Sequence, residues 1–125
     1  NALTILESLD LSQHANKACG GLPFGTMKRI ELARALINKP ELLLLDEPAT
    51  GLNQSEVNEL SSLIKTVRNE YGLTILLVEH HMGMVMGISD RVVVLDFGSK
   101  IAEGTPQDIQ QNPIVISAYL GVSND

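Results

Sequence analysis

The apolar residues in the middle of the chain follow two different spacings. Four leucines in a row, residues 42–45, end at Asp46 and Glu47, and a second apolar run occupies residues 74–78. A short apolar run of this kind is typical of a strand buried on both faces of a parallel sheet. The alternative for the first run, a helix with both acids in its first turn, is disfavoured by Pro48 and by the absence of a 3.6-residue period. We therefore predict two buried strands, at 42–47 and 74–78.

The segment between these runs predicts a long helix with one apolar face. Its apolar residues recur at spacings of three and four, and they are Val57, Leu60, Ile64, Val67 and Tyr71. Asn53, with Glu56 three residues later, predicts a capping box at the start of this helix, and Gly72 predicts a left-handed cap at its end. A strand, a helix and a strand in succession predict that the two strands are parallel.

Shorter patterns flank this central unit. Before it we predict a short helix and a polar turn in residues 1–19, a glycine-rich loop in 20–25 and a helix in 26–38. After it we predict a short helix in 82–88, a β-hairpin in 91–103, a helix that Thr105 caps and a final helical turn after Pro113 that runs through Leu120. The methionines of 82–88 are interpreted as core residues.

Composition narrows the class of protein. The chain has 125 residues, 44% of them hydrophobic, which is enough for the core of one domain. Its net charge is −6 and its nine Lys and Arg residues are scattered, so nucleic acid is not expected as a partner. A single cysteine, Cys19, excludes an internal disulfide, and no apolar run is long enough to span a bilayer. We expect a cytoplasmic protein and, because no Met or strand precedes the first helix, a carboxyl-terminal piece of a longer chain.

The two acids at the end of the first strand suggest chemistry. Ligands bind at the carboxyl edge of the strands in open α/β sheets. At that edge Asp46 can hold a hydrated Mg²⁺, and Glu47 can take a proton from an attacking water. Residues 79–81, Glu-His-His, leave the second strand at the same edge but lack the histidine spacing of a zinc metalloprotease helix. The loop at 20–25 places the start of the next helix, with its free amides and positive dipole end, in a position that suits a phosphate.

Taken in order, these segments resemble the carboxyl-terminal part of the ATP-binding subunit of ABC transporters. Residues 42–47 match the Walker B strand, and His80 matches the H-loop. The signature motif falls at Leu22, Pro23, Phe24, Gly25 and Thr26, and the D-loop falls at Gly51, Leu52 and Asn53. The resemblance covers essentially the whole chain, and its tail, from Ile101 onward, is most similar to the branched-chain amino acid importer branch.

The resemblance implies a fold and a division of the chain. The fold would be α/β, a partial P-loop NTPase (RecA-like) parallel sheet with flanking helices and a carboxyl-terminal β-hairpin. Residues 1–125 would form a single incomplete domain. Within it, 1–25 would be the end of the helical subdomain with the signature loop, and 26–125 would be the carboxyl-terminal part of the catalytic core.

It also implies an activity, ATP hydrolysis coupled to solute uptake, with ATP and Mg²⁺ as cofactors. Asp46 would hold Mg²⁺, Glu47 would act as general base, and His80 would contact the γ-phosphate. The signature loop would close over ATP bound to a second ATP-binding subunit. Transmembrane permease subunits would be the other partners, and they would hold the protein at the inner face of the plasma membrane.

The sequence departs from the family pattern at several points. Pro23 stands where the signature motif has serine, Thr26 where it has glutamine, and Asn53 where the D-loop has aspartate. Pro23 has no side-chain hydrogen bond to offer, so contact with a phosphate would depend more on backbone amides. No G-x-x-x-x-G-K-[ST] stretch, the Walker A motif, occurs in the 125 residues, so we expect the chain alone neither to bind ATP tightly nor to hydrolyse it.

Two other functions are compatible with parts of this pattern. A catalytically idle module that docks on a permease or a partner ATPase would fit Pro23 and the missing Walker A motif. A DNA-repair or chromosome ATPase of the same superfamily would carry long heptad arms, which this sequence lacks. In the family, the Walker A strand lies between the strands at 74–78 and 91–96. We therefore expect the chain either to close that slot by rearranging its hairpin or to fill it by self-association.

Overall fold

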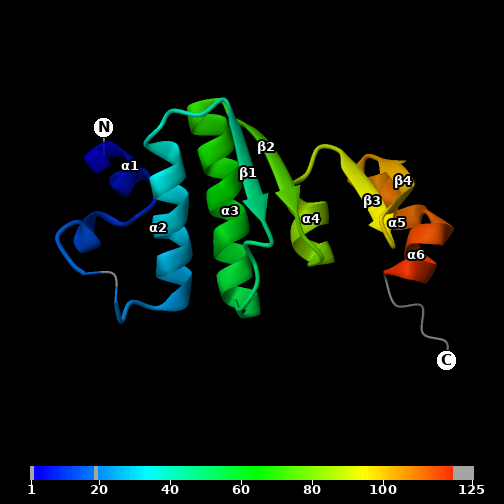
Figure 1. Cartoon of the computed structure of the whole chain (residues 1–125), viewed down its shortest axis with the longest axis horizontal. Helices are drawn as coiled ribbons and strands as arrows, with labels where there is room; N and C mark the ends of the chain where they lie inside the picture. Colours follow the sequence, from blue (N-terminus) through cyan, green and yellow to red (C-terminus); the bar gives the residue numbers. More distant parts are fainter. Residues whose placement is uncertain (1, 19, 120–125) are drawn as a thin grey trace. The chain divides into compact units, whose positions relative to one another are not determined.

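The computed structural model describes residues 2–18 and 20–119. The chain divides into two compact units, Asn1–Glu79 and His80–Asp125. The first unit contains α1 (Ala2–Ser8), a short 3₁₀ helix (Ser12–His14), α2 (Phe24–Leu36), β1 (Leu42–Asp46), α3 (Gln54–Tyr71) and β2 (Thr74–Val78) (Figure 1). The second contains α4 (Met82–Ile88), β3 (Val92–Asp96), β4 (Ser99–Gly104), α5 (Pro106–Gln111) and α6 (Pro113–Ala118). None of the described helices is both long and apolar enough to cross a membrane.

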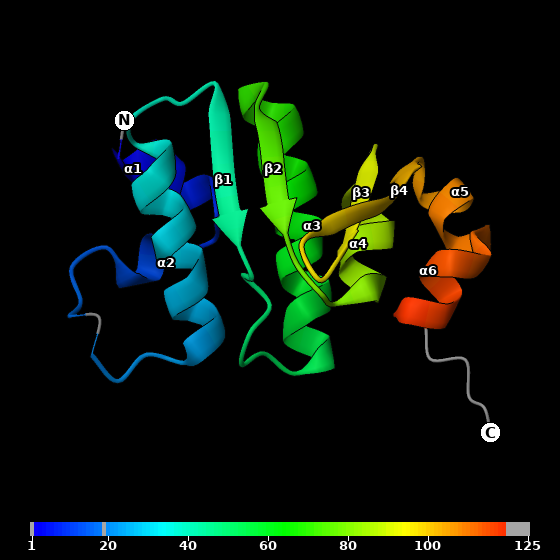
Figure 2. The same cartoon turned by 45° about the vertical axis from the view of Figure 1, so that its right-hand side comes forward.

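Strands β1 and β2 form a parallel pair, as the sequence predicts. Their register runs from Leu42 opposite Thr74 to Asp46 opposite Val78. Figure 2 shows the two strands side by side with α3 behind them. Because both strands run in the same direction, the residues that follow Asp46 and Val78 leave the sheet at the same edge.

The predicted burial of these strands on both faces is wrong. Along β1, Leu43 is buried, whereas Leu42 and Leu44 are 53% and 65% exposed. In β2, Leu76 and Val78 are likewise exposed. Side chains alternate between the faces of a strand, and helices of the first unit cover one face of this sheet. The apolar runs are therefore strands with one packed face and one open face.

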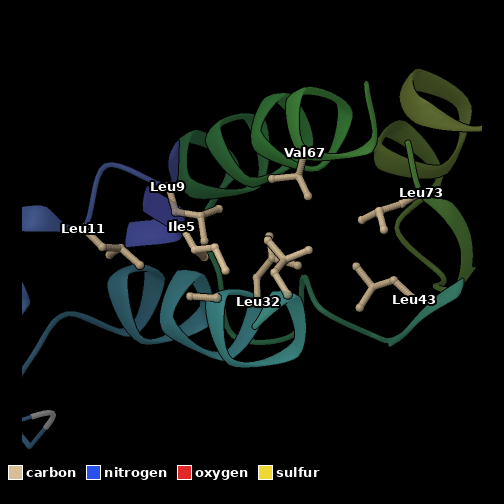
Figure 3. Close-up of a cluster of buried hydrophobic side chains, with 9 residues drawn as sticks. Ile5, Leu9, Leu11, Leu32, Leu43, Val67 and Leu73 are labelled. Atoms are coloured by element: carbon tan, nitrogen blue, oxygen red, sulfur yellow. The ribbon is translucent and has the colours of Figure 1, made fainter. Parts of the chain in front are cut away.

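The packed face of β1 belongs to the main hydrophobic core of the first unit. Figure 3 shows this core between α2 and α3, with α1 at one end and β1 at the other. Its buried members are Ile5, Leu9, Leu11, Leu32, Ala33, Leu36, Leu43, Val67 and Leu73. By packing Leu43 against the helices, the core fixes β1 and with it the position of the acids that follow.

Helix α3 has the predicted ends. Asn53 and Glu56 form a capping box, and Gly72 ends the helix with a φ of 64°. The predicted apolar stripe is buried except at Tyr71, which is partly exposed and whose hydroxyl lies 3.0 Å from Ser8 Oγ. These features depend on residues close together in sequence, which is why the pattern predicts them well.

Helix α2 lies two residues earlier than predicted, at Phe24–Leu36 instead of 26–38. Pro23 occupies its N-cap position with a φ of −55° and a ψ of 149°. Proline fixes φ and cannot donate a backbone hydrogen bond, so it is well suited to the residue at which a helix begins. The signature loop therefore contributes Phe24, Gly25 and Thr26 to the first turn of the helix.

The second unit confirms the predicted hairpin and helices. Strands β3 and β4 are antiparallel, Thr105 caps α5 in a capping box with Asp108, and α6 begins at Pro113. Met84 of α4 is buried, as expected for a core residue. The predicted end of the last helical turn, Leu120, lies outside the described residues.

The strands of the described residues form two separate two-stranded sheets, β1–β2 and β3–β4. The hairpin belongs to the second unit, so closure of the slot by its rearrangement stays a prediction. Both outer edges of the β1–β2 pair lack a strand partner in the part of the chain that the structure describes. Self-association, the other expected outcome, stays a prediction.

Candidate functional site

The acidic edge of the first unit is built by the end of β1. Asp46 is the last residue of the strand, and Glu47 follows with a φ of 48°. The Glu47 amide still donates a hydrogen bond to the Val78 carbonyl oxygen at 2.7 Å. Positive φ is uncommon for a residue with a side chain, and such conformations occur often at functional sites. Both carboxylates are in exposed residues and can meet a ligand.

A third acid, Glu79, joins this edge. Carboxylate oxygens of Glu47 and Glu79 lie within 4.8 Å of one another. The Oε2 atom of Glu79 accepts a hydrogen bond from the Ala49 amide at 3.0 Å. The sequence analysis predicts that Glu79 lies at this edge but assigns it no function. The feature that points to it is an acidic residue directly after the neighbouring strand. Carboxylate oxygens are the ligands that a hard cation such as Mg²⁺ prefers, so an edge with the exposed Asp46 beside Glu47 and Glu79 has the chemistry for that ion.

The turn after Glu47 connects the acidic edge to α3. The Thr50 amide donates to the Glu47 carbonyl at 3.2 Å, and the Leu52 amide donates to the Ala49 carbonyl at 3.1 Å. Gly51 has a φ of 85°, a conformation that favours glycine. The predicted D-loop residues Gly51, Leu52 and Asn53 therefore form one tight turn that ends in the capping box of α3.

The predicted signature residues surround the start of α2. Leu22 is half-buried, Pro23 makes no side-chain hydrogen bond to the helix, and the first amides of a helix have no partner within it. Thr26 is only 7% exposed, and its hydroxyl oxygen accepts a hydrogen bond from Arg29 Nη2 at 3.5 Å. The side chain of Thr26 therefore contacts its own unit. The backbone amides in the first turn of α2 remain as the groups that can bind an anion.

The signature segment and the D-loop turn, although far apart in sequence, lie against each other. A Cβ atom built on Gly51 would be 2.7 Å from Cε2 of Phe24, and one built on Gly25 would be 3.2 Å from Oε2 of Glu56. His80, the remaining predicted site residue, is exposed and directly follows Glu79 as the first residue of the second unit.

A cavity of about 200 Å³ lies between α2, β1 and α3. Leucines, alanine and isoleucine form most of its wall, while Lys28, Glu31 and Asp46 supply its charged side chains. Such a mostly apolar wall does not suit a triphosphate. The candidate site is therefore the exposed edge formed by Asp46, Glu47 and the neighbouring turns.

One carboxylate outside this edge has a perturbed pKa. Hydrogen bonds from Lys100 and, to a smaller extent, Arg91 lower the pKa of Glu103 from the usual value of a glutamate. Both contacts are 3.0 Å long; the one from Lys100 lies within β4, and the one from Arg91 joins β4 to the residue before β3. This group belongs to the second unit and stabilises the hairpin.

Comparison with solved structures defines the class of fold. The chain matches MJ1267, an ATP-binding cassette of an ABC transporter in its ADP conformation, with a TM-score of 0.86 and 31% identity over 96% of this chain and 48% of that one. It also matches cbiO1 from Clostridium perfringens, part of the ABC transporter complex cbiONQ, with a TM-score of 0.83 and 28% identity over 97% of this chain and 49% of that one. The chain is therefore part of a P-loop NTPase fold of the ATP-binding cassette class.

Comparison of sequences identifies the family. The ABC transporter family model matches residues 1–50, and the model described as branched-chain amino acid ATP-binding cassette transporter matches residues 99–124. Among relatives, LivG of Escherichia coli K12, a high-affinity branched-chain amino acid transport ATP-binding protein, is 51% identical over 120 residues, which are 96% of this chain and 47% of LivG. BraF of Pseudomonas aeruginosa, which has the same description, is 47% identical over 93% of this chain and 46% of BraF.

These matches confirm the resemblance to ATP-binding subunits of ABC transporters that the sequence motifs predict. It spans about half the length of the curated relatives that it matches.

Proposed function

We propose that the chain is part of the ATP-hydrolysing subunit of an ABC importer that takes up branched-chain amino acids or a related solute. The observation that supports it most directly is the acidic edge, where two consecutive exposed carboxylates, Asp46 and Glu47, follow a strand that the core holds in place. The names of LivG and BraF support the class of solute.

The chemistry of phosphoryl transfer assigns a role to each group at this edge. Asp46 would hold Mg²⁺, which when bound neutralises charge on the β- and γ-phosphates. Glu47 accepts a proton from the attacking water, and its exposed position leaves room for that water. Glu79 orients the turn after Glu47 through its hydrogen bond to the Ala49 amide. His80 donates a hydrogen bond to the γ-phosphate.

A second ATP-binding subunit completes the site in this proposal. The first turn of α2 offers backbone amides to the γ-phosphate of ATP that the partner binds, since neither Pro23 nor the buried Thr26 has a side chain available for it. Leu22, Phe24 and Gly25 shape that turn. Gly51, Leu52 and Asn53 lie beside it and face the partner subunit. Permease subunits would hold the assembled pair at the cytoplasmic face of the membrane.

The test of the ATPase uses the full-length protein with Glu47→Gln. We expect ATP binding to be retained and hydrolysis to fall by roughly 10²- to 10⁴-fold, the usual loss when a general base is removed. Glu59→Gln, which neutralises an exposed acid on α3, is the matched control and should leave turnover unchanged. Turnover of Glu47→Gln within about threefold of wild type would remove Glu47 from this role. A wild-type protein without ATPase activity would favour the idle docking module.

The solute is tested by transport. Cells that lack the chromosomal copy should recover uptake of labelled leucine, isoleucine and valine when the full-length wild-type gene is returned, and should not recover it with Glu47→Gln. If the protein hydrolyses ATP but uptake of these amino acids does not change, the proposed class of solute is refuted and the proposed ATPase activity stands.

A further inference from the structure

We propose that Phe24 is a positioning residue that holds the signature segment (residues 22–26) and the D-loop turn (residues 51–53) together as one rigid surface. The inference rests on the proposed function, because it concerns how these two segments face a partner subunit. It assigns the aromatic ring of Phe24 to a contact within its own chain instead of to the nucleotide.

The first observation is the space that the ring occupies. A Cβ atom on Gly51 would lie 2.7 Å from Cε2, 3.3 Å from Cζ and 3.4 Å from Cδ2 of Phe24, so the ring fills the place of a side chain at Gly51. The backbone of Gly51, with its φ of 85°, also disfavours a side chain. Glycine at this position therefore allows the D-loop turn to approach the ring closely.

A second contact joins the signature segment to the first turn of α3, directly after the D-loop turn. The Oε1 atom of Glu56 accepts a hydrogen bond from the Asn53 amide at 3.0 Å, and Asn53 Oδ1 accepts one from the Glu56 amide at 2.8 Å. This capping box fixes the Glu56 carboxylate, whose other oxygen, Oε2, would lie 3.2 Å from a Cβ atom on Gly25. Gly51 thus lets the D-loop turn rest on the ring of Phe24, and Gly25 lets the signature segment rest on Glu56 in the first turn of α3.

The ring has one further partner on its own helix. The Nζ atom of Lys28 lies 5.2 Å from the ring centroid, within the range of a cation–π interaction. Phe24 is about half exposed, so its place is set by these few contacts and not by burial in the core. Removal of the ring should therefore loosen the signature segment from the D-loop turn without opening the hydrophobic core.

This role predicts a particular kinetic effect in the full-length protein. If the two segments no longer move together, fewer sites assemble at a given ATP concentration, which raises KM. Once a site has assembled, Asp46 and Glu47 are unchanged, so kcat is largely kept. A merely structural defect would reduce the fraction of active protein, which lowers kcat and leaves KM in place.

The experiment measures ATPase kinetics and urea unfolding for full-length variants. Phe24→Ala should raise KM for ATP by about tenfold with kcat within threefold of wild type, and Phe24→Tyr, which keeps the ring, should restore KM. Gly51→Ala should lower the urea midpoint, and by less in the Phe24→Ala background, because the clash with the ring is then gone. Gly98→Ala is the matched control: its φ is 81°, and a Cβ atom built there would meet none of the described residues within 4 Å except its chain neighbours. Its cost should therefore be the same in both backgrounds.

Each outcome separates the two proposals. If wild type hydrolyses ATP but Phe24→Ala lowers kcat with KM unchanged, or if Phe24→Tyr fails to restore KM, the positioning role is refuted and the proposed function stands. Equal effects of Gly51→Ala in both backgrounds would show that the ring and the turn are not coupled, which also refutes it. Absence of ATPase activity in the wild-type protein refutes both proposals.

Discussion

At the scale of single residues, Pro23 sets the start of α2. It caps the helix without a side-chain hydrogen bond. Pro23→Ser in the full-length protein adds a hydroxyl that can bond to a phosphate, and one hydrogen bond to a charged group stabilises by about 1.5 to 3 kcal/mol at best. We expect ATP-driven dimerisation, measured by sedimentation, to become stronger by up to that amount.

The hydroxyl could instead cap α2, and a second variant and measurement separate the two effects. A cap raises the free energy of unfolding by about 1 kcal/mol without changing the ATP-dependent dimer. Pro23→Ala removes the proline ring without adding a hydroxyl and serves as the control. An unchanged or weaker dimer with Pro23→Ser would show that the backbone amides already suffice or that proline is required.

Single residues also show what the sequence could and could not predict. Asn53 and Gly72 were identified as caps because each acts on backbone within a few residues of itself. The contact of Phe24 with Gly51 and the hydrogen bond from the Ala49 amide to Glu79 join residues far apart in sequence, and no local pattern reports such pairs. The acids of the candidate site were placed correctly because the strand that precedes them is a local signal.

At the scale of elements, α3 depends on its capping box. Asn53→Ala removes one partner of that box, which should lower the free energy of unfolding of the full-length protein by about 0.5 to 2 kcal/mol. The hydrogen bond from the Asn53 amide to the Glu56 carboxylate is kept, because its donor is backbone. Urea unfolding measures the loss.

The matched control for this change lies further along the same helix. Asn58 is exposed, and its side-chain oxygen accepts a hydrogen bond from the Gln54 side chain at 3.0 Å. Asn58→Ala should cost no more than about 0.5 kcal/mol. Equal losses for the two variants would mean that the box does not stabilise the start of α3. Asn53→Asp keeps the oxygen that the cap needs and adds a charge that the helix dipole favours, so it should not destabilise.

The secondary-structure elements were predicted better than the packing around them. The parallel pairing of β1 and β2 follows from two apolar runs separated by a helix, and it is correct; β1 ends at Asp46, one residue before the predicted end. The prediction that both faces of these strands are buried was wrong. An apolar run indicates that a face can be buried, but it does not show which element packs against that face. Leu43 meets the helices of its own unit, whereas Leu44 on the opposite face has no such cover.

At the scale of the whole molecule, the open face of the β1–β2 pair should govern how the 125 residues behave on their own. Leu42, Leu44, Leu76 and Val78 are each more than half exposed on two adjacent strands. Contiguous exposed apolar surface favours association, and a strand edge without a partner can pair with another chain. We therefore predict that the isolated chain self-associates at micromolar concentration and that sedimentation velocity shows species larger than a monomer.

Substitutions on the open face test the cause of this association. Leu44→Lys and Leu76→Lys each place a charge there and should shift the distribution toward monomer, with little loss of stability because both side chains are exposed in the monomer. Ile114→Lys is the matched control, since Ile114 is 57% exposed on α6 and lies outside this sheet. It should leave association unchanged. A wild-type chain that remains monomeric across this concentration range would contradict the prediction, and equal effects of all three variants would show that the association has no preference for this face.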